Sequence, residues 1–260
     1  MPLYSNWFKV HRSENKRKRL WKFTEKANGR DAVKALLYTA VRSHYDSVDR
    51  IANDVEKLGY KVAARILRER LPRTKKARSG DLGEILACEL VEEKMDFTVP
   101  VRRLRYKDGR EMALRGDDFI GVRWDEEDGL LQLLKGESKS RIILSETTIT
   151  KARASLNRDN GRCTPSSLLF VADRLLDDDD DDKADLGRAL REEVGTKSLP
   201  ATRIDHVLFT MSGNTPPEAL EHDLKAASAG RNQTVVNIRI EDHQEFIAET
   251  YKGAEEFGND

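Results

Sequence analysis

The sequence predicts an α/β fold in which helices flank a β-sheet, with a helical N-terminal region. Three patterns indicate it: apolar residues recur at helical spacing over 31–93, the period changes to two over 97–140, and strand and helix patterns alternate over 205–255. A chain of 260 residues holds one large domain or two small ones. We expect a basic helical region at 1–72 and a second domain at 73–260, or one continuous domain.

The first half of the chain reads as helical. Apolar side chains follow helical spacing in 31–43 and in 46–71, and Gly59 is a candidate break within the second stretch. A basic loop is expected at 73–78 and a third helix at 79–93, where Ser79 is a candidate cap.

The middle of the chain then alternates with a period of two. Residues 97–105 are expected to form a strand that turns at 107–110. Two further strands are expected at 118–124 and 130–140, joined as a hairpin, and a helix at 147–157 follows.

The last hundred residues carry alternating patterns. Helices are expected at 166–176, 186–194, 217–229 and 242–255, and strands at 205–211 and 234–240. Six aspartates in a row at 177–182 repel one another, which favours a solvated loop. The strand–helix–strand–helix order would let this tail extend the same sheet.

Composition excludes several classes of protein. Lys plus Arg equals Asp plus Glu at 46 each, which argues against a wholly basic coat protein but allows a local basic surface. Only two cysteines, Cys88 and Cys163, argue against a disulfide scaffold and a cysteine-based zinc site. No signal peptide and no apolar run of ~18 residues is present, so we expect a soluble cytoplasmic protein.

The strongest local signal for chemistry is Glu137-Ser138-Lys139, at the end of an apolar strand. Residues two apart on a strand share a face, so Glu137 and Lys139 project side by side. A carboxylate can hold a hard cation such as Mg²⁺, and a lysine can position a water or offset charge on a phosphate. The alternative is an ordinary exposed ion pair.

Two adjacent acids, Asp117 and Asp118, precede the strand that pairs with the Glu137 strand. Because adjacent strands lie about 4.8 Å apart, one of these acids could share a cation with Glu137. Asp118 is the better candidate because it belongs to the strand and shares a face with Ile120, and Asp117 is the alternate. A simple Gly-Asp turn explains the same residues.

The third candidate is Glu84, on the helix at 79–93. Ala87 and Cys88 lie three and four residues further on, so the carboxylate sits on a small, apolar helix face and needs a metal or a basic partner. The alternative is a surface glutamate near a helix N-terminus, where negative charge is favourable.

Together, the helical acid, the strand Asp and the Glu-x-Lys strand followed by a helix resemble the PD-(D/E)xK nuclease superfamily over residues 79–157. The resemblance implies a mixed sheet flanked by helices. It also implies that Glu84, Asp118 and Glu137 hold Mg²⁺, with Mn²⁺ as an alternative, and that Lys139 assists attack on phosphate.

The segments around Gly83-Glu84, Gly116–Asp118 and Gly136–Lys139, with the overall length, also resemble the HamA family of the Hachiman anti-phage defence system. That resemblance implies a partner, the superfamily 2 helicase HamB. We cannot assign from the sequence which acid of the Asp117-Asp118 pair matches the family's metal ligand.

Basic clusters fit a DNA substrate, because Lys and Arg bind phosphates without reading sequence. The candidate DNA-binding residues are Lys75, Lys76, Arg78, Arg102, Arg103 and Arg105. An ordinary solvated surface is the alternative for these residues. A basic run, Lys16-Arg17-Lys18-Arg19, lies near Trp21 in the N-terminal thirty residues and could bind nucleic acid or a partner.

The sequence therefore predicts a Mg²⁺-dependent nuclease that cleaves DNA phosphodiester bonds and is restrained by a helicase partner until phage infection or DNA damage. Two alternatives stay open: a non-catalytic adaptor that holds the helicase on DNA, and a stand-alone restriction-type endonuclease.

Overall fold

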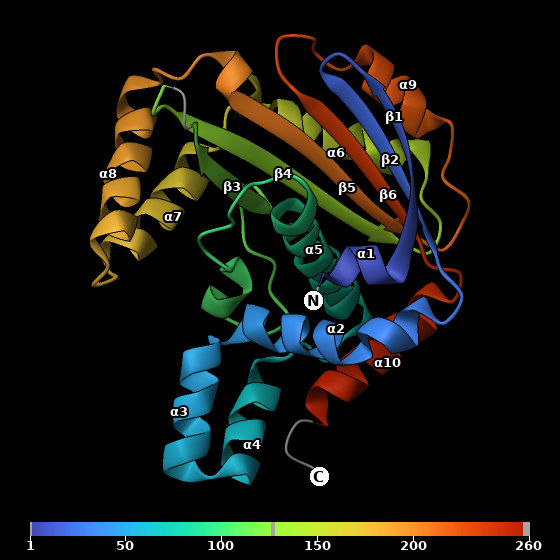
Figure 1. The fold of residues 1–260 in the computed structure, drawn as a ribbon, viewed down its shortest axis with the longest axis vertical. Coiled ribbons are helices and arrows are strands. Elements are labelled where there is room, and N and C mark those ends of the chain that lie inside the picture. Colours follow the sequence, from blue (N-terminus) through green and yellow to red (C-terminus); the bar gives the residue numbers. More distant parts are fainter. Residues whose placement is uncertain (1, 126–127, 257–260) are drawn as a thin grey trace.

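A six-stranded mixed sheet forms the centre of the molecule, with the strand order β1-β2-β6-β5-β4-β3 (Figure 1). The computed structural model describes residues 2–125 and 128–256. The strands are β1 (Phe8–Asn15), β2 (Lys18–Glu25), β3 (Phe119–Trp124), β4 (Leu131–Arg141), β5 (Ile204–Ser212) and β6 (Gln233–Arg239). The central strands β2, β6, β5 and β4 are parallel, and the outer strands pair antiparallel. The predicted mixed α/β fold is confirmed.

Helices cover both faces of this sheet. They are α1 (Leu3–Trp7), α2 (Gly29–Tyr45), α3 (Val48–Leu58), α4 (Tyr60–Arg70), α5 (Lys75–Lys94), α6 (Glu146–Asn157), α7 (Pro165–Leu176), α8 (Asp181–Thr196), α9 (Ala219–Ala226) and α10 (His243–Glu255). The main core lies between the sheet and α1, α2, α5 and α10, and α6 and α9 pack on the other face. Helices α3 and α4 project from the body as a pair (Figure 1). None of the described helices is long and apolar enough to cross a membrane.

Helix α5 lies very close to β4, and this contact positions the candidate site. A Cβ atom on Gly83 would lie 2.9 Å from Ser138 Oγ, so only glycine fits there without a shift. The Ser79 and Ser140 hydroxyls share a hydrogen bond of 2.8 Å across the same interface. On β4 itself, a Cβ on Gly136 would overlap the ring of Phe119 on β3. Glycines at these two points set how closely α5, β3 and β4 approach.

Most predicted elements are present with shifted ends. Gly59 separates α3 from α4 as expected, and Ser145 caps α6 by accepting a hydrogen bond from the N–H of Thr148. The tail does extend the sheet, through β5 and β6. The aspartate run is not wholly a loop, because Asp180 caps α8 and the last two aspartates form its first turn.

The N-terminal region is helical only in part. Residues 29–70 form helices, but β1 and β2 form a hairpin that joins the central sheet beside β6. Trp21 and Phe23, two residues apart on β2, are both buried in the main core, whereas Lys22 between them is only partly buried, as expected for a strand with one face on the core. The division of the chain at residue 72 stays a prediction.

Two further predictions are wrong. The basic loop expected at 73–78 is mostly the first turn of α5, because Thr74, not Ser79, accepts the capping hydrogen bond, from the N–H of Ala77. The strand expected at 97–105 and its turn at 107–110 do not form. This segment pairs with β3 only through a bridge between Thr98 and Val122 and then enters a short 3₁₀ helix at Arg103–Tyr106.

Candidate active site

Three of the four predicted residues meet at the junction of β3 and β4. Phe119 pairs with Gly136, which places Asp118 opposite Glu137. The Asp118 carboxylate accepts a hydrogen bond of 2.7 Å from the N–H of Ser138, so its orientation is fixed by the strand backbone. The Lys139 ammonium contacts the Glu137 carboxylate and lies 3.8 Å from Asp118 Oδ2.

The fourth residue, Glu84, approaches from the opposite face of the sheet. Ser138 and Ser140 face α5, so Glu137 and Lys139, which alternate with them, face the other way. Glu84 lies on α5, and Asp118 is the charge that most raises its pKa. Glu84 and Glu137 therefore approach Asp118 from the two sides of the sheet.

Negative charge is in excess at this point. Burial and the Asp118 charge raise the pKa of Glu84 well above its usual value. The same two causes raise the pKa of Glu137 to about 7, although the Lys139 ammonium and a hydrogen bond from Ser155 on α6 lower it. Neither glutamate would have a raised pKa if enough positive charge faced it. Lys139 near Glu137, and Arg103 and Lys107 near Glu84, offset these causes only in part.

The donor chemistry fits a hard divalent cation. Three carboxylates supply oxygen ligands of the type that Mg²⁺ and Mn²⁺ take. Among the residues that the structure describes, Glu84 is partly buried and has no hydrogen-bond or ion-pair partner. In the same part of the chain, no group of three or more His, Cys, Asp or Glu side chains is placed to hold a metal ion. Lys139 supplies the positive charge between Asp118 and Glu137 in this structure.

The alternate acid, Asp117, has a different environment. It is 1% exposed and accepts hydrogen bonds from the Thr164 N–H (2.6 Å) and hydroxyl (2.8 Å). Its own N–H donates to Ser167 Oγ at 2.9 Å, and Lys135 Nζ lies 3.5 Å from its carboxylate. These contacts fasten the turn before β3 to α7, so Asp117 is a structural residue and Asp118 faces Glu137.

Comparison with known proteins identifies a family. The sequence model of a family described as HamA matches residues 2–254. The chain belongs to the HamA family. A curated relative, the Hachiman protein HamA of Bacillus cereus, is 26% identical over 184 residues, which are 71% of this chain and 63% of that protein. The match thus spans less than two thirds of the relative's length.

The basic residues predicted to bind DNA fall into two groups in this HamA-family chain: arginines with partners inside the fold, and exposed lysines. Arg102 pairs with Glu89 and Glu92, Arg103 donates to the carbonyl of Arg115, and Arg105 donates to the carbonyl of Ser43. Arg78 binds the Pro72 carbonyl and Glu255. These guanidinium groups hold the fold together, whereas Lys75 and Lys76 are exposed on the first turn of α5.

Three residues near the site were not predicted from the sequence to belong to it. Ser155 lies between the buried Ala152 and Leu156 on α6, a helical spacing that could have placed it toward the sheet. Arg103 and Lys107 both lower the pKa of Glu84, and Lys107 also pairs with Asp81 at 2.8 Å. No local signal marks Arg103 or Lys107, because both reach the site from a segment without regular strand structure.

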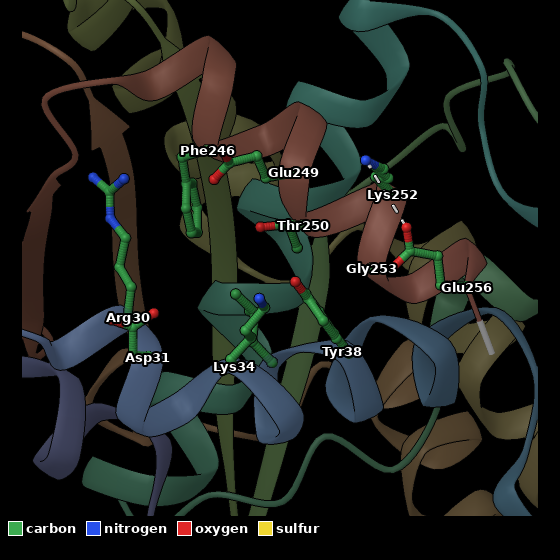
Figure 2. Close-up of a pocket in the computed structure, with 11 residues that line it drawn as sticks. Arg30, Asp31, Lys34, Tyr38, Phe246, Glu249, Thr250, Lys252, Gly253 and Glu256 are labelled. Carbon is green, nitrogen blue, oxygen red and sulfur yellow. Dashed lines mark ion pairs between the residues drawn. The ribbon is translucent and has the colours of Figure 1, made fainter. Parts of the chain in front are cut away.

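A separate cavity of about 420 Å³ lies between α2 and α10 (Figure 2). Basic and acidic side chains alternate around it, including Arg30, Lys34, Glu249 and Glu256. Arg30 also binds Glu25, outside the cavity lining, through two hydrogen bonds. None of the four predicted catalytic residues lines this cavity, so the candidate active site is elsewhere in this HamA-family chain.

Proposed function

We propose that this protein is a metal-dependent nuclease that cleaves DNA phosphodiester bonds as the effector of an anti-phage defence complex. The observation that carries the proposal is the position of Asp118, whose charge acts on Glu84 from one face of the sheet and on Glu137 from the other. This arrangement supports the PD-(D/E)xK assignment made from the sequence.

The carboxylates of Glu84, Asp118 and Glu137 would hold Mg²⁺ or Mn²⁺. A bound divalent cation lowers the pKa of a coordinated water and stabilises negative charge on a phosphate. The cation would then neutralise Glu137 and Asp118 in place of the Lys139 ammonium group. The ammonium group of Lys139 would then donate a hydrogen bond to the attacking water or to a phosphate oxygen. One bond from water oxygen to phosphorus forms as one P–O ester bond breaks.

Membership of the HamA family supports a role in anti-phage defence. The matched relative is named as a Hachiman protein, and we propose that this chain likewise acts in anti-phage defence. An unspecific nuclease would damage its host, so we propose that the superfamily 2 helicase HamB restrains it until it is triggered. Lys75 and Lys76, exposed on α5 eight or more residues before Glu84, would bind the DNA backbone.

The direct test is incubation of the purified chain with plasmid DNA, in Mg²⁺ or in EDTA, with and without the helicase. We expect degradation in Mg²⁺, no degradation in EDTA and slower degradation when the helicase is present. Intact plasmid under all four conditions would contradict the nuclease and its restraint together.

Glu84→Gln separates the nuclease from an adaptor, because it removes a carboxylate that could hold the cation and keeps the side-chain shape. Mg²⁺ should raise the melting temperature of the wild-type protein, since a ligand that binds only the native state stabilises it. We expect the variant to lose this shift and the cleavage, and to keep its binding to DNA and the helicase. A variant that still protects cells from phage would favour the adaptor.

A further inference from the structure

The loop that follows β4 exposes two adjacent isoleucines beside the candidate active site. Ile142 is 56% exposed and Ile143 is 72% exposed, the largest fraction among the large apolar side chains that the structure describes. They come three and four residues after Lys139. The next residue, Leu144, is 2% exposed, so the same loop buries one apolar side chain and leaves two in water.

This exposure does not come from a loosely held backbone. The N–H groups of Gly213 and Asn214, just after β5, donate to the carbonyl of Ile142 at 3.0 and 3.1 Å. The Leu144 N–H donates to Asn214 Oδ1 at 2.9 Å. Hydrogen bonds on both sides of Ile143 therefore fix the loop. Burial of an isoleucine side chain stabilises a protein, and the loop leaves most of that stabilisation unused at Ile143 and about half of it at Ile142.

Positive charge lies next to these side chains. Arg141 is exposed, and it pairs in register with Ser212, which in turn pairs with Arg239 on β6. Because neighbouring strands are about 4.8 Å apart, the two arginines lie about 10 Å apart along one row of the sheet. Arg239 is paired with Glu241 at 3.0 Å, while the guanidinium of Arg141 donates only to the neighbouring Ser140 carbonyl among the described contacts.

We infer that Ile142 and Ile143 form a wedge that inserts between nucleobases beside the phosphate to be cleaved. Apolar side chains such as isoleucine unstack base steps when they enter DNA, and arginines beside them bind the phosphates. Two side chains are too few for a stable protein interface, which buries about 800 Å² on each partner. This inference rests on the proposed nuclease function for the position of the cleaved phosphate.

Two matched double variants test the wedge. Ile142→Ser with Ile143→Ser removes it, and Val48→Ser with Leu58→Ser removes two apolar side chains of similar exposure, 59% and 50%, from α3. The first readout uses duplex DNA that contains 2-aminopurine, whose fluorescence rises when it leaves the base stack. All proteins carry Glu137→Gln here, so the DNA stays intact and the readout does not depend on cleavage.

We expect the fluorescence rise with the parent protein and with the α3 control, and its loss with the isoleucine variant. With Glu137 restored, the isoleucine variant should cleave duplex DNA at least about tenfold more slowly and single-stranded DNA within about threefold of wild type, because only the duplex needs unstacking. Circular dichroism melting checks that each variant folds.

An unchanged fluorescence rise in the isoleucine variant would overturn the inference. So would a variant that cleaves both substrates like wild type and yet fails to protect cells, which would assign the loop to a protein partner. If the wild-type protein cleaves nothing but the fluorescence still depends on the isoleucines, the nuclease proposal fails and the wedge stands.

Discussion

Strand β4 carries two lysines, four residues apart, and each contacts one acid of the same Asp-Asp pair. Lys135 is 1% exposed, lies 3.5 Å from Asp117 and donates to the carbonyls of Arg158 and Arg162 at 3.1 and 2.7 Å. Lys139 is partly exposed and contacts Glu137 and, at a longer distance, Asp118.

The surroundings of Lys135, in the middle of β4, and of Lys139, near its end, differ in how charge is balanced. The Lys135 ammonium group donates hydrogen bonds to two backbone carbonyls, and the Asp117 carboxylate accepts two hydrogen bonds from Thr164. At Lys139 one ammonium group lies beside the carboxylates of Glu137 and Asp118, and burial and the Asp118 charge raise the pKa of Glu137 and of Glu84. Complete hydrogen bonding indicates a structural ion pair, whereas unbalanced charge indicates a site prepared for a ligand.

Exchange of each lysine for methionine is the strongest test of this contrast. Lys139→Met should lower the rate of DNA cleavage by about 10³-fold, because the charge that acts on water or phosphate is lost. Its unfolding free energy at pH 6 should change by less than about 1 kcal/mol, since Glu137 can take up a proton. Plasmid cleavage and urea denaturation measure the two effects.

Lys135→Met should have the opposite effect. It leaves Asp117 buried and without its cation, which should lower the unfolding free energy by about 3 kcal/mol. At a temperature where the protein is still folded, cleavage should stay within about fivefold of wild type. Equal effects of the two substitutions on stability would remove the distinction between Lys135 and Lys139.

The aspartates give a second, smaller contrast. Asp117→Asn should destabilise the protein by about 2 kcal/mol, because an amide cannot accept two hydrogen bonds from Thr164 through both of its terminal atoms. Asp118→Asn should keep its stability and lose Mg²⁺-dependent cleavage. Thermal melting and cleavage assays on the two proteins decide between them, and the reverse ranking would place the metal ligand at Asp117.

The pH dependence of stability tests the charge excess directly. Glu137 has a pKa of about 7 in the folded protein instead of 4.5, so the folded state binds more protons and stability falls as pH rises through this window. Glu137→Gln mimics the protonated acid. In EDTA, the variant should be more stable than wild type by about 2 kcal/mol above pH 7, and the difference should vanish below about pH 4.5. A difference that does not vary with pH would contradict the raised pKa.

The smallest effect is expected at the surface of α5. Lys75→Ala with Lys76→Ala should weaken DNA binding about threefold to tenfold, without sequence preference, and should reduce the slope of log affinity against log salt by about 2. Fluorescence anisotropy across a salt series measures both. Arg102→Ala should instead lower stability, because Arg102 is held by Glu89 and Glu92.

Local signals predicted much of the fold. The apolar spacing of α2, the break at Gly59 and the alternation in β4 depend on neighbours in the sequence, and each appears close to its expected place. The segment 97–110 was misassigned because its partners are distant: Arg105 is fixed by the Ser43 carbonyl, and Arg102 by acids of α5. The hairpin of β1 and β2 was missed because charged residues mask its alternation.

The candidate site, too, was predicted only where it depends on residues that are neighbours in the sequence. The preference for Asp118 over Asp117 followed from strand alternation, and the register of β3 with β4 places Asp118 beside Glu137. The sequence could not reveal that α5 meets β4 through Gly83, which brings Glu84 to Asp118 from the other face. It also could not separate exposed lysines from arginines that hold the fold, because both occur in basic runs.

The order of strands in the sheet also has a consequence for how the protein is made. The ribosome produces β2 about 200 residues before β6, its neighbour in the sheet. Long-range strand pairing of this kind forms slowly and late. Until residues 233–239 have emerged, β4 and β5 cannot be joined to the N-terminal hairpin. A nascent chain that has not reached β6 therefore carries Glu137 and Lys139 on an incomplete sheet, which would delay the proposed nuclease activity until β6 is made.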